Sequence, residues 1–186
     1  MYKRQRLYPA AGNHHVLVIR RNRLFVVHAT DAEGEPLSRQ DIEFQLQAVV
    51  SLAGPPEAAV RPVGALTAWG RSEWASAREQ LVADGNEELL ERMEAAAVVV
   101  CLDDSAPETR SDVARALWHG DGRNRFFDKP VQVVVFRNGK AGLVGEHSMM
   151  DGMPVSRAVG AGGVFVQGYS QIGSLRTGRI GSDECV

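Results

Sequence analysis

The stretch VQVVVFRNGKAGLVG, residues 131–145, contains the clearest local folding signal in this 186-residue sequence. Two apolar runs, residues 131–136 and 141–145, flank the dipeptide Asn138-Gly139. Such runs predict strands, and Asn-Gly between them favours a two-residue type I′ turn, because both residues tolerate a positive φ. The sequence therefore predicts a β-hairpin, with His147 just past the end of its second strand.

Upstream of the hairpin, helical patterns alternate with short apolar runs. The expected helices are residues 39–52 with a capping-box-like start at Ser38, a helix with Ser72 as its N-cap, a helix that starts after Asn86, and residues 111–118. The expected strands are residues 98–102, and residues 16–19 with 24–29, which form either a strand pair or one long interrupted strand. Helices interleaved with strands predict an α/β fold with a mixed sheet and flanking helices.

Composition bounds the class of protein. The hydrophobic fraction of 44% and charged fraction of 24% are those of an ordinary globular domain. A net charge of −2, without a concentrated basic face, leads us to expect no nucleic-acid partner. The apolar runs are too short to cross a bilayer and the N-terminus lacks a secretory pattern, so we expect an intracellular protein. Cys101 lies in an apolar run, which predicts a buried, reduced thiol.

The C-terminal part of the chain differs in character from the rest. Beyond residue 157 glycines are frequent, and neither helical nor strand periodicity persists. We therefore expect one domain over residues 1–157, followed by a Gly-rich tail, residues 158–186, that is poorly ordered or aberrant.

Two side chains just after the hairpin, His147 and Asp151, are the candidate catalytic residues. In a helical turn, residues four apart share a face, so Asp151 could accept a hydrogen bond from one ring nitrogen of His147 and leave the other nitrogen free as a base. On spacing alone, a histidine and an aspartate four residues apart more often form a surface ion pair or a hydrogen bond that stabilises a loop. A His/Asp hydrolase would also need a nucleophile, and Ser148 is a weak candidate for that role.

Several segments resemble the carnitine/choline acyltransferase family. The densest likeness joins NRFFDK at residues 124–129, the hairpin, and GEHSMMDG at residues 145–152. PVGALT at residues 62–67, followed by Arg71 and Trp74, and VVVCLD at residues 98–103 are similar to further family segments and occur in the same order. The resemblance covers about residues 14–155. Within it we expect Phe126 and Phe127 to anchor the core and Asp128 to make local hydrogen bonds at the strand entry.

This resemblance implies a fold, an activity and a site. It implies part of a CoA-dependent acyltransferase fold, like that of chloramphenicol acetyltransferase, and reversible acyl transfer between CoA and carnitine. His147 would be the general base, oriented by Asp151. Acyl-CoA and carnitine would be substrates, with no bound cofactor and no metal. The likeness of residues 145–152 favours carnitine and a short acyl group, and leaves a mitochondrial, peroxisomal or cytoplasmic location open.

The departures from the family suggest an alternative. Family members are much longer, and the basic residues for CoA, the contacts to the carnitine carboxylate and the Ser-Thr-Ser-like motif are not identifiable in this sequence. The alternative is a non-catalytic, truncated remnant of such an enzyme. Either way, apolar surface left without its partner would favour self-association.

Overall fold

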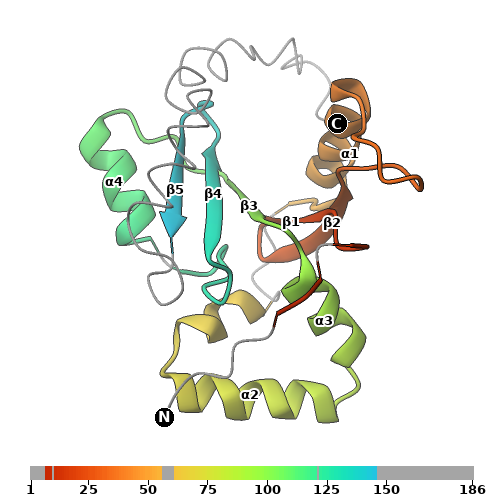
Figure 1. Ribbon diagram of the computed structural model, residues 1–186. Helices are drawn as coiled ribbons and strands as arrows, with labels where there is room; N and C mark the ends of the chain where they lie inside the picture. Colours follow the sequence, from red (N-terminus) through yellow and green to blue (C-terminus); the bar gives the residue numbers. More distant parts are fainter. Residues whose placement is uncertain (1–6, 10, 56–60, 121, 146–186) are drawn as a thin grey trace.

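The computed structural model describes residues 7–9, 11–55, 61–120 and 122–145, so His147, Asp151 and the Gly-rich tail lie outside the described residues. The described residues form five strands together with the helices that connect and flank them, arranged as in Figure 1. The elements are β1 (His15–Arg20), β2 (Arg23–His28), α1 (Arg39–Leu52), the 3₁₀ helix η1 (Val63–Ala68), α2 (Arg71–Ala83), α3 (Glu87–Ala95), β3 (Val99–Asp103), α4 (Arg110–Trp118), β4 (Val131–Phe136) and β5 (Ala141–Gly145).

The strands form one mixed sheet in the order β2-β1-β3-β4-β5. The three central strands, β1, β3 and β4, run parallel, whereas β2 and β5 lie antiparallel to their neighbours at the two ends of the described sheet. Parallel neighbours need long crossover connections, which here contain the helices. The predicted α/β class with a mixed sheet and flanking helices is therefore confirmed.

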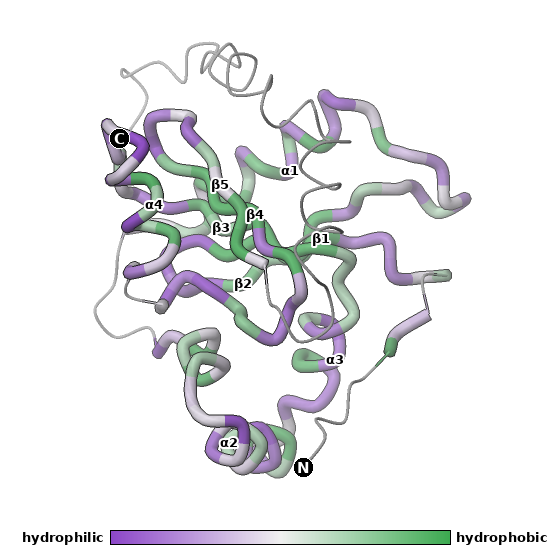
Figure 2. The backbone as a smooth tube through the Cα atoms, turned by 60° about the vertical axis from the view of Figure 1, so that its left-hand side comes forward, coloured by the Kyte–Doolittle hydropathy of each residue, from purple (hydrophilic) through white to green (hydrophobic). Residues whose placement is uncertain are grey.

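The strands of the sheet consist largely of hydrophobic residues (Figure 2), and their buried side chains form two core clusters. On one face, Leu17, Cys101 and Val134 pack with side chains of α3 and α4 in the larger core. On the other face, Val18 and Val27 pack against Val49 of α1. Burial of apolar area of this kind is the main favourable term in folding. None of the helices in the described ranges combines the length and apolar content needed to cross a bilayer.

The turn between β4 and β5 is not the predicted type I′ turn. Gly139 has a φ of 78°, but Asn138 is not among the described residues with a positive φ. The Gly139 amide donates to the Phe136 carbonyl at 2.9 Å, and the Phe136 amide donates to the Lys140 carbonyl at 2.8 Å. This geometry is that of a type I turn closed by a glycine bulge. The prediction was wrong because the hydrogen bond between Phe136 and Lys140 leaves three residues in the loop, whereas a type I′ hairpin turn has two.

The two-residue turn with positive φ instead joins β1 to β2. Arg21 and Asn22 have φ values of 51° and 62°, as a type I′ turn requires at its two central positions. Arg20 therefore pairs with Arg23, and the two segments form a strand pair rather than one interrupted strand. A left-handed conformation costs a residue with a side chain about 1–2 kcal/mol, so this turn depends on contacts made elsewhere in the fold.

Helix boundaries followed their capping residues only in part. The Ser38 hydroxyl accepts a hydrogen bond from the Asp41 amide, as expected for the start of α1. Ser72 is not an N-cap, because α2 already begins at Arg71. α4 begins with a capping box between Thr109 and Asp112, one residue before the predicted start at residue 111.

Candidate functional site

The last strand of the described sheet, β5, ends just before the candidate catalytic segment in the sequence. Gly145, the last residue of β5, pairs with Val131, the first residue of β4. The described sheet therefore ends two residues before His147 in the sequence, at the edge where β4 begins. The predicted pair His147 and Asp151 lies outside the described residues, so its mutual geometry stays a prediction. The residues that fix this edge of the sheet are described.

Asp128, three residues before β4, connects this edge to α2. Its carboxylate accepts a hydrogen bond from the indole nitrogen of Trp74 and lies 2.6 Å from the guanidinium of Arg71. The Trp74 side chain is only 2% exposed. We expected local hydrogen bonds from Asp128, and this was wrong: its partners lie on a helix more than 50 positions earlier. The packing of α2 against η1 and α3 brings them together, and the local sequence does not encode this packing.

Lys129 connects the same segment to α3. Its ammonium group donates to the backbone carbonyls of Glu94 and Ala96 at the C-terminal end of that helix. These carbonyls lack partners within the helix and carry its partial negative charge, so they favour a cation. Burial lowers the pKa of Lys129, and the nearby charge of Glu94 opposes that shift.

The carboxylate of Glu94 is itself well held, by the side chains of Arg78 and Tyr8. The Arg78 guanidinium donates to it at 2.5 and 3.0 Å, and the Tyr8 hydroxyl donates at 2.7 Å. The hydrogen bond with Glu94 raises the pKa of Arg78. α2, α3 and the segment before β4 therefore form one connected polar network.

The two phenylalanines of the segment differ in their burial. Phe126 is fully buried in the larger core, and its amide donates to the side-chain oxygen of Gln132 at 2.7 Å. Phe127 is half-buried, and its amide donates to the hydroxyl of Thr67 in η1 at 2.8 Å. The predicted core anchor is thus confirmed for Phe126 and holds in part for Phe127.

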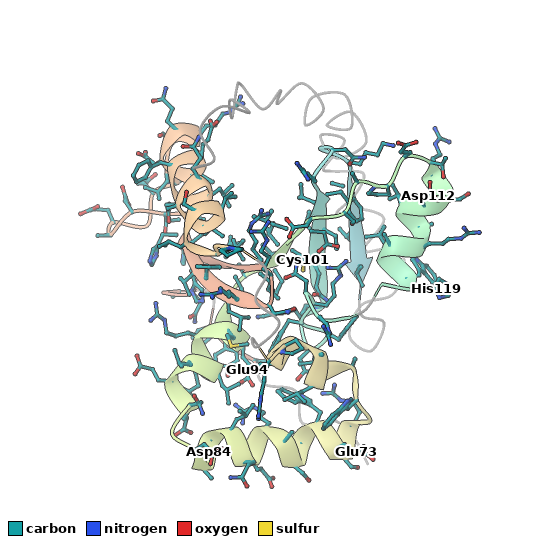
Figure 3. All side chains as sticks on the ribbon, turned by 180° about the vertical axis from the view of Figure 1, so that it is seen from behind. Glu73, Asp84, Glu94, Cys101, Asp112 and His119 are labelled. Atoms are coloured by element: carbon teal, nitrogen blue, oxygen red, sulfur yellow. The ribbon has the colours of Figure 1, made fainter. Side chains whose placement is uncertain are left out.

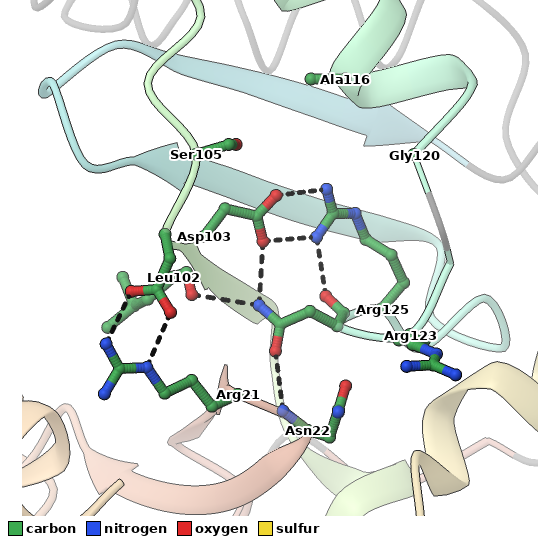
Figure 4. Close-up of a pocket in the computed structure, with 11 residues that line it drawn as sticks. Arg21, Asn22, Leu102, Asp103, Ser105, Ala116, Gly120, Arg123 and Arg125 are labelled. Carbon is green, nitrogen blue, oxygen red and sulfur yellow. Dashed lines mark hydrogen bonds and ion pairs between the residues drawn. The ribbon is translucent and has the colours of Figure 1, made fainter. Parts of the chain in front are cut away.

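A buried ion pair fixes the other end of the segment (Figure 4). Two nitrogens of Arg125 donate to the two carboxylate oxygens of Asp103, each at 2.8 Å. The side-chain amide of Asn124 donates to the carboxylate of Asp103 at 2.9 Å and to the backbone carbonyls of Leu102 and Ile19. Burial alone would lower the pKa of Arg125, but hydrogen bonds and charge from Asp103 raise it overall. The segment 124–129 is therefore bonded at its start to β1 and β3 and at its end to α2 and α3.

A cavity of about 490 Å³ opens beside this ion pair. Arg21, Asn22, Asp104 and Ser105 contribute to its wall. It lies at the carboxyl ends of β1 and β3, the edge opposite to the one at which β5 ends. In Figure 4 the charged groups of Arg21, Arg125 and Asp103 are engaged with one another or with neighbouring acidic and polar groups. This cavity is therefore separate from the end of β5.

Cys101 lies inside the molecule (Figure 3). The side chain is 0% exposed, and burial raises the pKa of the thiol to about 12. A nucleophilic cysteine needs an accessible, electropositive setting. The prediction of a buried core thiol is confirmed.

The pairing of Arg125 with Asp103 and the contact of Lys129 with the end of α3 were not predicted from the sequence. One signal was available: Asp103 ends an apolar strand, and a carboxylate at a buried position needs a partner. The identity of that partner, 22 positions along the chain, was not readable from local pattern.

The fold and this segment define an α/β protein in which residues 124–129 join the mixed sheet to α2 and α3. Comparison with known proteins gives the family. The family model for choline/carnitine o-acyltransferases matches residues 2–173, and the chain belongs to this family. This family assignment confirms the resemblance seen in the sequence.

Individual relatives agree with that assignment. The chain is 35% identical over 155 residues to the mitochondrial carnitine O-palmitoyltransferase 2 of Rattus norvegicus, covering 83% of this chain and 23% of the rat protein. It is 34% identical to the mitochondrial carnitine O-acetyltransferase of Saccharomyces cerevisiae, over 79% of this chain and 22% of that protein. It is 37% identical to the choline O-acetyltransferase of Gallus gallus, over 75% of this chain and 23% of that protein. The chain thus spans about a quarter of the length of these relatives.

Proposed function

We propose that this chain takes part in acyl transfer between CoA and carnitine, with His147 as the general base and Asp151 as the residue that orients it. The observation that carries the proposal is membership of the choline/carnitine o-acyltransferase family over residues 2–173, a match that includes both residues. The proposal is also supported by the place of His147 in the sequence, two residues after Gly145, the last residue of β5.

The proposed chemistry is a direct transfer without an acyl-enzyme. One ring nitrogen of His147 removes the proton from the carnitine hydroxyl, and the oxygen attacks the carbonyl carbon of the acyl thioester. The new C–O bond forms, the C–S bond breaks, and the CoA sulfur takes the proton back from the imidazolium. Asp151 would stabilise that imidazolium and set the ring tautomer. A base is needed because an alcohol is a weak nucleophile at neutral pH.

The described residues would contribute position rather than chemistry. Holding a catalytic group in place relative to its substrate can supply about 7–11 kcal/mol of a barrier, provided the supporting structure is rigid. Asp128, Lys129 and Phe127 bond the entry of β4 to α2, α3 and η1, and β4 is paired with the strand that leads to His147.

Finer features of the assignment belong to the same proposal. We propose that the sheet is part of a chloramphenicol acetyltransferase-like fold, that residues 1–157 form a partial carnitine/choline acyltransferase domain followed by the Gly-rich tail, and that the protein acts inside the cell. The relatives differ in alcohol and acyl chain, since their names specify palmitoyl or acetyl groups and carnitine or choline. We propose carnitine and a short acyl group from the likeness of residues 145–152 to short-chain carnitine enzymes.

The test is an acyl-transfer assay on the purified chain. Release of the CoA thiol is measured with acetyl-CoA or palmitoyl-CoA, in the presence of carnitine, choline or neither. We expect carnitine-dependent release from acetyl-CoA, reduced about 10²- to 10⁴-fold in His147→Ala and retained in the matched control Ser148→Ala. An unchanged rate in His147→Ala would refute the role of the histidine.

The remaining outcomes separate the alternatives. Thiol release without carnitine that Ser148→Ala abolishes would indicate a hydrolase. No turnover by the wild-type chain with any substrate pair would favour the non-catalytic remnant, which the coverage of only 23% of the rat relative motivates.

A further inference from the structure

We infer that the cavity at the carboxyl ends of β1 and β3 binds a small ligand that carries a phosphate group, with Arg21 and Arg123 as its cationic contacts. Ligands of open α/β sheets commonly bind outside the carboxyl ends of the parallel strands. The inference does not rest on the proposed acyl transfer, because this cavity and the end of β5 lie at opposite edges of the sheet.

Positive charge exceeds negative charge around this cavity. Among the described residues, the charged side chains that line it or act on Asp104 are Arg20, Arg21, Arg123, Arg125, Arg137, Asp103 and Asp104. The hydrogen bond from Arg21, together with the charges of the neighbouring arginines, holds the pKa of Asp104 below its usual range. Arginines thus outnumber aspartates, and a cleft with a surplus of one sign of charge attracts ligands of the opposite sign.

The two aspartates differ in how firmly they hold their arginines. The side chains of Asp103 and Arg125 are 17% and 7% exposed, so this pair stays closed. Asp104 is 43% exposed, and ion pairs of such exposure contribute little to stability. An anion can therefore share Arg21 with Asp104 and leave the buried pair intact.

Donor groups remain available on the cavity wall. A guanidinium has five N–H donors, of which Arg21 directs one to the Gly54 carbonyl and two to the Asp104 carboxylate. The side-chain amide of Asn22 and the hydroxyl of Ser105 line the same cavity and make no hydrogen bond to other described residues. Donors of these kinds, and arginine above all, bind phosphate oxygens.

The turn that contains Arg21 is an unusual place for a long cationic side chain. Arg21 has a φ of 51° and occupies the first central position of a type I′ turn, where Asn, Asp and Gly are preferred. Residues with side chains in left-handed conformations cluster at ligand-binding sites, where the strain is maintained by what they bind. The guanidinium of Arg21 reaches the cavity wall from this turn (Figure 4).

A phosphate group fits this wall better than a carboxylate does. A phosphate monoester carries about −1.5 to −2 charges and three acceptor oxygens, which suits several cations and donors that come from different segments. The cavity of about 490 Å³ lies within the range of small-molecule pockets, about 300–1,000 Å³. Leu102 and Ala116 add apolar wall, so the ligand can include a small organic group.

Isothermal titration calorimetry of the full 186-residue chain tests the site, with phenyl phosphate, inorganic phosphate and benzoate as probes. We expect saturable binding of phenyl phosphate, about tenfold tighter than that of benzoate, which has the same ring with a single charge. Tighter binding of phenyl phosphate than of inorganic phosphate identifies an organic phosphate as the ligand, and equal binding identifies the free ion. Benzoate binding as tight as phenyl phosphate overturns the proposal, as does no binding of either phosphate up to about 10 mM.

Two matched arginine variants locate the binding. Arg21→Asn removes the guanidinium and retains a residue that tolerates positive φ, and it should weaken phenyl phosphate binding about tenfold. Arg71→Asn removes another aspartate-paired arginine, on α2, and should leave the affinity unchanged. An equal loss of affinity in both variants would show a general charge effect and overturn the proposal.

Asp104→Asn keeps the test decisive if Arg21→Asn does not fold. Because Asp104 is 43% exposed, its replacement should be tolerated. The variant removes the carboxylate that competes for Arg21 and repels an anion, so phenyl phosphate should bind about threefold more tightly. An affinity equal to or weaker than that of the wild type overturns the proposal.

Discussion

Asp103 and Asp104 are neighbours with similar partners and very different surroundings, and they should respond differently to the same substitution. Each carboxylate binds an arginine through two nitrogens. The side chains of Asp103 and Arg125 are 17% and 7% exposed, whereas Asp104 is 43% exposed. Replacement by Asn preserves the shape in both cases and removes the negative charge.

The magnitudes follow from burial. Asp103→Asn leaves the guanidinium of Arg125 buried without a counter-charge, which costs about 3–5 kcal/mol. Asp104→Asn weakens a partly solvated pair, worth about 0.2–1 kcal/mol. With a urea m value of about 2 kcal/mol per molar, the unfolding midpoint should fall by about 2 M for Asp103→Asn and by at most about 0.5 M for Asp104→Asn.

Urea unfolding followed by tryptophan fluorescence and circular dichroism measures both shifts. The double variant Asp103→Leu with Arg125→Met should recover most of the lost stability, because no isolated charge then stays buried. Equal midpoints for the two Asn variants, or a double variant less stable than Asp103→Asn alone, would refute the reasoning.

Three further predictions concern other parts of the fold. Gly64→Ala should cost about 1–3 kcal/mol in the same urea assay, because the added methyl group would overlap the carbonyl oxygen of Arg125; an unchanged midpoint would contradict this. In a Cys185→Ser background, Cys101 should resist a thiol reagent at pH 8 until urea unfolds the chain, and rapid labelling of the native protein would argue against burial. The pKa of Cys101 is raised from 9.0 to about 12, so its contribution to stability is present below about pH 9 and lost as the pH rises towards 12. The chain should also self-associate in light-scattering measurements. Val133→Thr, on the half-buried apolar face of β4, should reduce the measured molecular mass. A monomeric mass at all concentrations would contradict this expectation.

Local pattern was sufficient for most elements. The helix over residues 39–52 and its serine cap, the buried strand near residue 100 and the two strands of the hairpin were all predicted, because apolar periodicity and capping act over a few residues. Turn geometry was less accessible. The two-residue turn with positive φ lies at Arg21 and Asn22 and not at Asn138-Gly139, because two residues separate the paired ends of β1 and β2 whereas three separate the bonded residues Phe136 and Lys140.

For the site, the sequence by itself determined the family, through the order of several segments, and named His147 and Asp151 as the residues to test. Only the tertiary structure decided how the segment before β4 is held: Arg125 by Asp103, Asp128 by α2 and Lys129 by the end of α3. The physical reason is that a charge removed from water must find a partner, and that partner can lie anywhere in the chain that packing brings within hydrogen-bond distance.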